Sequence, residues 1–403
     1  MSLFSMTTLP VLSRFRSARP LATLLRRAVH MGAATHLRFA TLSAVLLAVA
    51  LPLAAQAQSP DRVPAEMLEI TPPSGRVEGE LSRMSIVPLG CRSAPSADVR
   101  RRIVDVAIQE WAFFGFPVLD RLNGARLLPD TRIRAGRVTF ENTTRRAPTP
   151  NAREGERVAA TIAGYWAVTP EGAGIVAAQA RRWEERGAGV RWNAPWSAAF
   201  ISWVMCEAGL GTRDEFHRAI AHWTYIDQAI RARDAGEGAP GGASDGSRSR
   251  VGYVAYDIGE RAVEPGDLLC SGRRPRYANL AGRRLQMGEG ASSHCDIVVE
   301  ADAETGRILA IGGNVLRAVS LKVLAGRPGR GPEGGMYAVA TSAAPLFAHL
   351  KLQAEPIDDR ALSDSEVLAA LTSGNGGPTP SRGALVLDAL SVQGAWMEQG
   401  IGR

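Results

Sequence analysis

The sequence is poor in cysteine, in lysine and in long apolar runs, and each shortage removes a class of protein. Only four of the 403 residues are cysteine, too few for a scaffold that depends on disulfides for its fold. No two cysteines have CxxC spacing and no HExxH motif occurs, so we expect no metal site and no cofactor. After Ala57 no apolar run reaches the roughly 18 residues that span a bilayer, so we expect no stable membrane insertion of the mature chain.

Lysine occurs only at Lys322 and Lys351, and all other basic residues except the histidines are arginine. The formal net charge of +7 comes mainly from residues 1–58, which hold six arginines and no carboxylate. The rest of the chain is nearly neutral, with 41 basic against 40 acidic residues. No stripe of basic residues interleaved with aromatic residues is present, so we expect no nucleic-acid partner.

The N-terminal segment has the features of a signal peptide. Residues 42–53 form an apolar core, Arg38 precedes it, and Ala55-Gln56-Ala57 has the small-x-small pattern of a cleavage site. Cleavage is expected after Ala57, and translation from Met31 would give a signal of the usual length. The alternative is a membrane anchor, which the shortness of the apolar run disfavours. We predict a periplasmic or secreted bacterial protein.

The order of helical and strand patterns predicts an α+β fold. Helical spacing is present over residues 97–114, 195–209 and 214–231, whereas strand patterns dominate from residue 267 to residue 340. No internal repeat is visible, and we expect a monomer. The predicted parts are a signal peptide (1–57), an extended lead-in (58–95), one domain (96–353) and a loosely attached or disordered tail (354–403).

Cysteines in an exported protein can be oxidised to disulfides. Cys270 ends one predicted strand and Cys295 begins the next, so the two can face each other as a disulfide. One bridge is expected, and the four cysteines leave room for two.

Ser197 occupies a position suited to a nucleophile. If Pro195 takes the first helical position, Ser197 lies in the first turn, where unpaired backbone N–H groups and the positive end of the helix dipole gather. This environment favours a thiolate or a developing oxyanion. The alternative is a helix-start residue whose hydroxyl is satisfied locally.

His294 begins a strand whose alternation places His294, Asp296, Val298 and Glu300 on one face. Glu300 lies about 20 Å along the strand from His294, too far to orient the imidazole ring. The orienting group is therefore expected on another element.

A hairpin supplies a candidate for that group. If Ala301 pairs with Arg307 across the turn, His294 lies opposite Asn314, within reach of an imidazole-to-amide hydrogen bond. A turn that is one residue different in length would move the partner to Gly313.

Four motifs in this order resemble those of the NlpC-type and CHAP-type cell-wall amidases and peptidases, whose fold is a small relative of papain. The set looks closest to an uncharacterised exported bacterial family, domain of unknown function 2272, over residues 99–340. The resemblance implies a papain-like α+β fold with N-terminal helices packed on a small antiparallel sheet. It assigns the nucleophile to Ser197, the base to His294 and the orienting residue to Asn314. The matching motifs are PWSAAF at 195–200, Gly266-Asp267, HCDIVV at 294–299 and Gly312-Gly313-Asn314.

The nucleophile position departs from the family pattern, which has cysteine where this chain has Ser197. A thiol near neutral pH is partly ionised, whereas a hydroxyl needs His294 as a true general base during the attack. We therefore weigh two functions. One is a serine-type amidase or peptidase that hydrolyses peptidoglycan peptides. The other is a catalytically silent module that binds peptidoglycan or another envelope polymer.

Further residues are candidates for substrate binding. Trp196, His222 and Tyr225 could line the cleft, the alternative being that they pack in the core. Arg273 and Arg274 belong to an arginine-rich loop between two predicted strands, which could act as a lid that recognises carboxylates. The alternative is a solvated loop.

Overall fold

The computed structural model describes residues 62–128, 141–142, 152–236, 252–274, 277–329, 334–373 and 381–400, all within the unit Gln56–Arg403. The predicted signal peptide and its cleavage site lie outside the described residues. No helix in the described ranges is long and apolar enough to cross a membrane.

Helix α2 (Ser96–Phe113) forms because apolar residues recur at helical spacing up to a glycine. Its inner face, which includes Ile103 and Trp111, is fully buried. Gly115, at a φ of 81°, takes the left-handed conformation that ends the helix. The Trp111 indole N–H then donates to the carbonyl oxygen of Pro117 at 2.8 Å. The helix predicted over residues 97–114 is confirmed.

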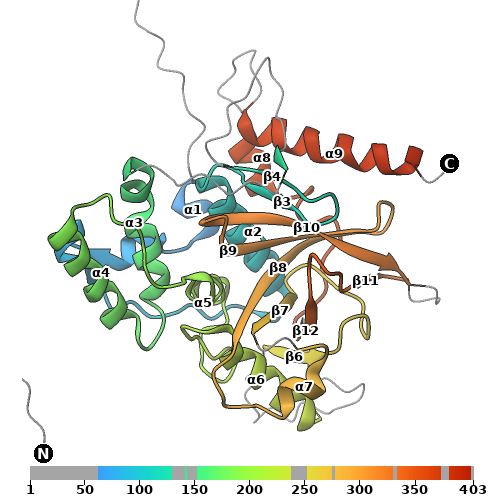
Figure 1. The fold of residues 1–403 in the computed structure, drawn as a ribbon, viewed down its shortest axis with the longest axis horizontal. Coiled ribbons are helices and arrows are strands. Elements are labelled where there is room, and N and C mark those ends of the chain that lie inside the picture. The colour runs from blue at the N-terminus through green and yellow to red at the C-terminus, as the bar shows by residue number, and fades with distance from the viewer. Residues whose placement is uncertain are drawn as a thin grey trace, which may run out of the picture. The chain divides into compact units, whose positions relative to one another are not determined.

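Helix α5 (Ser197–Ala208) is buried on all sides, as expected for a helix whose residues are almost all apolar or small. Helices α3 (Ala152–Trp166) and α4 (Gly172–Arg186) lie on one side of it, and the long strands of the sheet lie on the other (Figure 1). Gly209, at a φ of 117°, ends α5, and a Cβ there would lie only 2.3 Å from the Cβ of Ala94. Glycine is therefore required at this helix end.

Ten of the described strands form one sheet in the order β5-β4-β3-β10-β9-β8-β7-β12-β6, with β11 paired to β10 outside this path. The central strands β8, β9 and β10 are the longest, and they pass beside α5 and α2 (Figure 1). The strands are β3 (Val118–Asp120), β4 (Ala125–Leu127), β5 (Glu141–Asn142), β6 (Tyr253–Tyr256), β7 (Leu268–Arg274), β8 (Ser292–Asp302), β9 (Arg307–Val315), β10 (Ala318–Pro328), β11 (Met336–Ala338) and β12 (Leu346–Leu352).

The α+β class is confirmed, but the sheet is not the small antiparallel one expected, since its described part has ten strands and one parallel pair. Strand β3 pairs with β10 in parallel, and the unpredicted strands β6 and β12 extend the sheet beyond β7. The pattern of β12 was missed because His349 and Lys351 interrupt its apolar residues. His349 is nevertheless buried, since its Nε2 contacts the Asp267 carboxylate at 2.8 Å.

Helix α6 (His222–Asp234) begins eight residues later than residue 214, where the spacing predicted it. The Glu215 carboxylate accepts hydrogen bonds from both the backbone N–H and the hydroxyl of Thr212, each at 2.9 Å. Such local side-chain bonds offer the backbone an alternative to helix. The Ser202 hydroxyl then donates to the Ala219 carbonyl at 3.1 Å and accepts from its N–H at 3.0 Å. This pair holds the segment before α6 against α5.

In the tail predicted to be loosely attached, apolar side chains between residues 361 and 390 that the structure describes are packed into the core instead. Helix α8 (Glu366–Thr372) buries Leu368 and Leu371 in the same core as α2, and helix α9 (Arg382–Gly400) follows it. The Ser365 side chain caps α8 by accepting from the Leu368 N–H at 3.2 Å, and its hydroxyl donates to Asp105 of α2 at 2.7 Å. Apolar spacing over residues 361–371 was the signal for this attachment.

The predicted extended lead-in contains several short elements and contributes Val63, Ile70 and Met84 to the main core. The elements are α1 (Ala65–Leu68), the 3-10 helices η1 (Pro73–Arg76) and η2 (Leu81–Arg83), and the two-stranded sheet of β1 (Val77–Glu78) and β2 (Ser85–Ile86).

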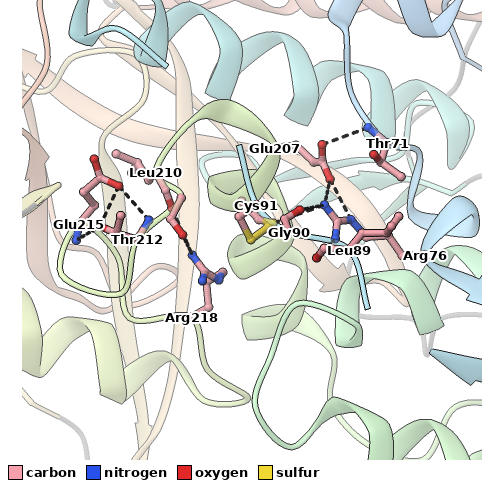
Figure 2. Close-up of a disulfide and its surroundings, with 12 residues drawn as sticks. Thr71, Arg76, Leu89, Gly90, Cys91, Glu207, Leu210, Thr212, Glu215 and Arg218 are labelled. Atoms are coloured by element: carbon pink, nitrogen blue, oxygen red, sulfur yellow. Dashed lines mark hydrogen bonds and ion pairs between the residues drawn. A yellow bond between two sulfur atoms is a disulfide. The ribbon is translucent and has the colours of Figure 1, made fainter. Parts of the chain in front are cut away.

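Two disulfides join elements that are distant in sequence. Cys270 of β7 is bonded to Cys295 of β8, the pair expected from the strand ends, and Cys91 of the lead-in is bonded to Cys206 of α5. Figure 2 shows Arg76 and Glu207 beside the second bridge, joined by a buried ion pair with Arg76 Nε 2.8 Å from the carboxylate. Disulfides of this kind are typical of proteins outside the reducing cytosol.

Candidate functional site

Ser197 is the first residue of α5. Its helix starts two residues after Pro195 and has no side-chain cap, and the first ladder bond runs from the Phe200 N–H to the Trp196 carbonyl at 3.0 Å. The N–H groups of residues 197–199 therefore precede the ladder, at the positive end of the helix dipole. Ser197 is 9% exposed, so its hydroxyl lies just beneath the surface.

His222, at the first position of α6, is the hydrogen-bond partner of Ser197. The Nε2 of His222 lies 2.7 Å from the Ser197 Oγ. The contact follows from the fold, because Ser202, one turn further along α5, holds Ala219 and so delivers the start of α6 to the start of α5.

The contacts of the other ring nitrogen, Nδ1, indicate which nitrogen of His222 carries the hydrogen. The backbone N–H of Cys295 donates to Nδ1 at 3.2 Å, and the Tyr225 hydroxyl also contacts Nδ1. Because Nδ1 accepts, the ring hydrogen is on Nε2 and is donated to the Ser197 Oγ. Burial, with the nearby His294, lowers the pKa of His222 well below its usual value, so the ring is neutral.

His294 of β8 lies in a buried polar chain with Asp296 and Lys322. The His294 Nε2 is 2.9 Å from Asp296 Oδ1, and Asp296 Oδ2 accepts from the Lys322 Nζ at 2.7 Å. Burial opposes ionisation of Asp296, but Lys322 and His294 outweigh it, and the pKa of Asp296 lies below its usual range. Asp296 is therefore an ionised carboxylate.

An ionised carboxylate can only accept, so the His294 ring carries its hydrogen on Nε2 and a lone pair on Nδ1. That Nδ1 is buried and has no hydrogen-bond partner among the residues that the structure describes. Burial and then Lys322 lower the pKa of His294, which keeps the ring neutral. The result is an imidazole with a free basic nitrogen and a carboxylate behind it.

The two histidines belong to one cluster. Their ring centroids are 5.1 Å apart and the rings are edge-on. His222 therefore contacts Ser197 through Nε2 and packs against His294 through its ring. Both are nearly enclosed, with 4% and 2% exposure.

Two glycines of β9 allow this packing. A Cβ on Gly312 would lie 2.0 Å from Asp296 Oδ1 and 3.1 Å from His294 Nε2. A Cβ on Gly313 would lie 2.5 Å from the Cβ of Phe200 on α5. Because glycine has no Cβ, both positions let the facing side chains approach the backbone of β9 closely.

The hairpin of β8 and β9 differs by one residue from the predicted register at its turn, where Asp302 rather than Ala301 pairs with Arg307. A bulge between Val298 and Glu300 restores the predicted register at Ile297↔Ile311. Asn314 lies three residues beyond this pair, half-buried, with a φ of 56°. The described residues include no hydrogen-bond partner for its side chain, and the carboxylate at His294 Nε2 belongs to Asp296.

The predicted substrate-binding residues have different surroundings. Trp196 is buried and stacked between Phe114 and Tyr165, each 5.7 Å away between ring centroids. Tyr225 is buried, and burial raises its pKa well above the usual value, so it keeps its hydroxyl hydrogen.

The arginine-rich loop is partly fixed by ion pairs. In helix α7 (Leu280–Arg284), Arg283 forms a buried two-pronged ion pair with Asp227 of α6, both contacts at 2.7 Å. Arg273 is exposed near the site, and the side chain of Arg274 is outside the described residues.

Asp267, of the Gly-Asp motif, lies in a second buried cluster. It accepts from Arg100 Nη1 at 2.9 Å, from the Leu352 N–H at 3.0 Å and contacts His349. These bonds tie α2 to β7 and β12. Asp267 is thus a structural residue where α2 packs against the sheet.

Sequence reasoning missed two members of the site, Asp296 and Lys322, and one contact. His222 was a candidate for substrate binding, but its pairing with Ser197 had no sequence signal, because it depends on how α6 meets α5. Asp296 did have a signal, since strand alternation places it on the face of His294 two residues away. Lys322 stood out only as one of two lysines. No group of three potential metal ligands occurs in the described residues.

Residues 156–331 match the model of a family described as "Uncharacterized protein conserved in bacteria (DUF2272)". The match contains Ser197, His222, His294, Asp296 and Lys322. Searches of curated proteins and of solved structures found no match.

Proposed function

We propose that this protein is an exported hydrolase of papain-like architecture that cleaves an amide or ester bond in peptidoglycan peptides. Ser197 is the nucleophile, and His294, with Asp296 in the orienting role expected of Asn314, is the base. The observation that carries the proposal is the free Nδ1 of His294, because a neutral imidazole backed by a carboxylate is the group that a serine nucleophile requires.

The position of Ser197 supports this assignment. In the attack, the Oγ bonds to the carbonyl carbon while its proton passes to the imidazole, and the oxyanion forms beside the unladdered N–H groups of the first turn of α5. His222 donates to the same Oγ. A hydroxyl that receives this bond keeps its own hydrogen free for transfer to a base.

Export supports an envelope substrate. The N-terminal signal pattern and the two disulfides favour a periplasmic or secreted protein. The exposed Arg273 near the histidines suits a substrate that carries carboxylates, as peptidoglycan peptides do.

A fluorophosphonate probe tests the nucleophile directly. We expect Ser197 to be labelled, and we expect both His294→Ala and Asp296→Asn to reduce labelling at least about 100-fold, the usual range for loss of a general base. Ser85→Ala, which removes an exposed serine of β2, should leave labelling unchanged. A folded protein that is labelled equally with and without His294 would end the proposal.

A silent binding module is the second candidate, and the burial of the two groups favours it. Ser197 is 9% exposed and His294 is 2% exposed, which restricts the access of a substrate to both. Ser197→Cys separates the two functions. A cysteine variant that hydrolyses peptidoglycan peptides supports the hydrolase, whereas an inert variant that still sediments with peptidoglycan sacculi supports the binding module.

A further inference from the structure

A cavity of about 550 Å³ shares no lining residue with the Ser197 cluster. Five segments surround it: the turn after β6, the residues before α7, the end of β10, the segment after β11 and the start of β12. The lining residues are Asp257, Ile258, Gly259, Ala278, Asn279, Arg327, Ala338, Val339, Ala340 and Leu346. A concave site of this size with a few polar groups on an apolar wall is typical of a small-molecule site.

Asp257 contributes a negative charge with an unused oxygen. Its Oδ1 accepts from the Leu280 N–H at 2.8 Å, and its other oxygen has no hydrogen-bond partner in the described part of the chain. The neighbouring carboxylate of Glu260 is already paired with Arg233 at 2.7 Å.

Arg327 contributes a positive charge to the same cavity. Its guanidinium packs over the Tyr337 ring at 5.3 Å, and its Nη2 lies 3.6 Å from where a Cβ on Gly259 would be. Within the described residues it forms no ion pair. Opposite charges therefore line one cavity without meeting.

We propose that this cavity binds a small zwitterion, an α-amino acid or a dipeptide with free ends. Asp257 receives the ammonium group and Arg327 receives the carboxylate, which a guanidinium matches with two parallel hydrogen bonds. Two unpaired opposite charges are both neutralised only by a ligand that carries both signs. This site is separate from the proposed function and stands without it.

The remaining walls fit the body of such a ligand. Asn279 uses its Oδ1 to accept from the Gly282 N–H at 3.1 Å, which leaves its amide N–H groups free to donate to a ligand carbonyl. Ile258 and Leu346, with the alanines, supply an apolar wall for a small aliphatic side chain.

Calorimetric titration of the mature protein with alanyl-alanine tests the site. We expect saturable binding, and we expect it to weaken about tenfold or more with N-acetyl-alanyl-alanine, which lacks the ammonium, and with alanyl-alanine amide, which lacks the carboxylate. Titration with alanine distinguishes an amino-acid site from a dipeptide site. Absence of binding up to about 10 mM, or equal affinity for the blocked dipeptides, would overturn the proposal.

Two variants locate the binding. Asp257→Asn keeps the oxygen that accepts from Leu280 and should lose only the preference for a free ammonium, whereas Arg327→Gln should lose only the preference for a free carboxylate. Arg261→Gln, which removes a guanidinium stacked on Tyr256 outside the cavity, and Asp358→Asn, on an exposed turn, are the matched controls. Variants of Asp257 and Arg327 that bind all three dipeptides as the wild type does would also overturn it.

Discussion

His222 and His294 are buried, neutral imidazoles whose ring centroids are 5.1 Å apart. In the folded state the pKa of each is lowered, first by burial and then by a neighbouring positive or imidazole group. The unfolded chain takes up these two protons near the ordinary histidine pKa of about 6.5, whereas the folded chain does not. Folding therefore excludes protons at this site.

Stability should decrease as the pH falls below about 6.5, because the unfolded state then binds more protons than the folded state. Each histidine contributes a slope of up to about 1.4 kcal/mol per pH unit until its folded-state pKa is reached. Denaturant unfolding between pH 8 and pH 5 measures this slope. His222→Gln should flatten it, whereas His217→Gln should flatten it less, because His217 is only half-buried although its pKa is also lowered by burial and by Arg213. An unchanged slope in His222→Gln would contradict a neutral, buried His222.

Lys322 balances the buried charge of Asp296. Lys322→Met should lower the free energy of unfolding by about 3–5 kcal/mol, because it leaves the carboxylate buried without a counter-charge. The double variant with Asp296→Asn should recover part of the loss. Lys351→Met removes the only other lysine from a more exposed pair with Glu264. It should cost about 1 kcal/mol, because the buried Asp267, 3.6 Å from Lys351, keeps its ion pair with Arg100. Equal losses at the two lysines in urea unfolding would argue against the charge balance.

At the level of elements, the site depends on how closely β9 approaches β8 and α5. Gly312 lies so close to Asp296, and Gly313 so close to Phe200, that a Cβ at either position would clash with the facing side chain. A bulge in β8 sets the register that brings these residues together. The geometry of the site is therefore a property of the strand pair as well as of its polar residues.

Gly312→Ala should lower the free energy of unfolding by about 1–3 kcal/mol, the usual cost of forcing extra atoms into a packed core, and should reduce fluorophosphonate labelling. Gly174→Ala in α4, where a Cβ meets nothing within 4 Å, is the control and should be neutral or stabilising by up to about 1 kcal/mol. Thermal unfolding of both variants would show the difference. Tolerance of Gly312→Ala would mean that Asp296 is free to move.

The bridge between Cys91 and Cys206 ties the lead-in to α5 across 115 residues. Replacement of both cysteines by serine should lower the free energy of unfolding by about 2–5 kcal/mol. Urea unfolding of the oxidised wild type and of the variant gives this difference. Because Arg76 and Glu207 also join these elements, the variant should still fold (Figure 2). A variant as stable as the wild type would mean that the bridge is dispensable.

At the level of the whole molecule, the described chain combines one large sheet, helices packed against it, and a C-terminal helix pair that contributes to the same core. One disulfide joins two strands of the sheet, and the other joins the lead-in to α5. All four cysteines are bonded. A protein that folds in this way needs an oxidising compartment to reach its full stability.

Protein exported to the periplasm should begin at Gln58, because cleavage is expected after Ala57. It should contain no alkylatable thiol before reduction and four after it. N-terminal sequencing and mass spectrometry with iodoacetamide check both points. The same chain made without its first 57 residues in a reducing cytosol should have free thiols and lower stability. Free thiols at Cys270 and Cys295 in the exported protein would contradict the bridge beside the histidines.

Local pattern in the sequence determined much of this description. Apolar spacing and a terminal glycine placed α2 and α5, and alternation placed β8 and β9, because these signals act over a few residues. The same local reasoning placed Ser197 at a helix start and His294 near a strand start, and it paired Cys270 with Cys295. Asp296 was also within its reach, two residues from His294.

Only the tertiary structure decided which side chains meet. The contact of His222 with Ser197 depends on Ser202 and Ala219, and the role of Lys322 depends on β10 lying two strands from β8. A bulge shifts the strand register by one residue, and no periodicity in the sequence records it. Long-range pairing is set by the packing of the whole core, whereas local pattern is set by the backbone of a few neighbouring residues.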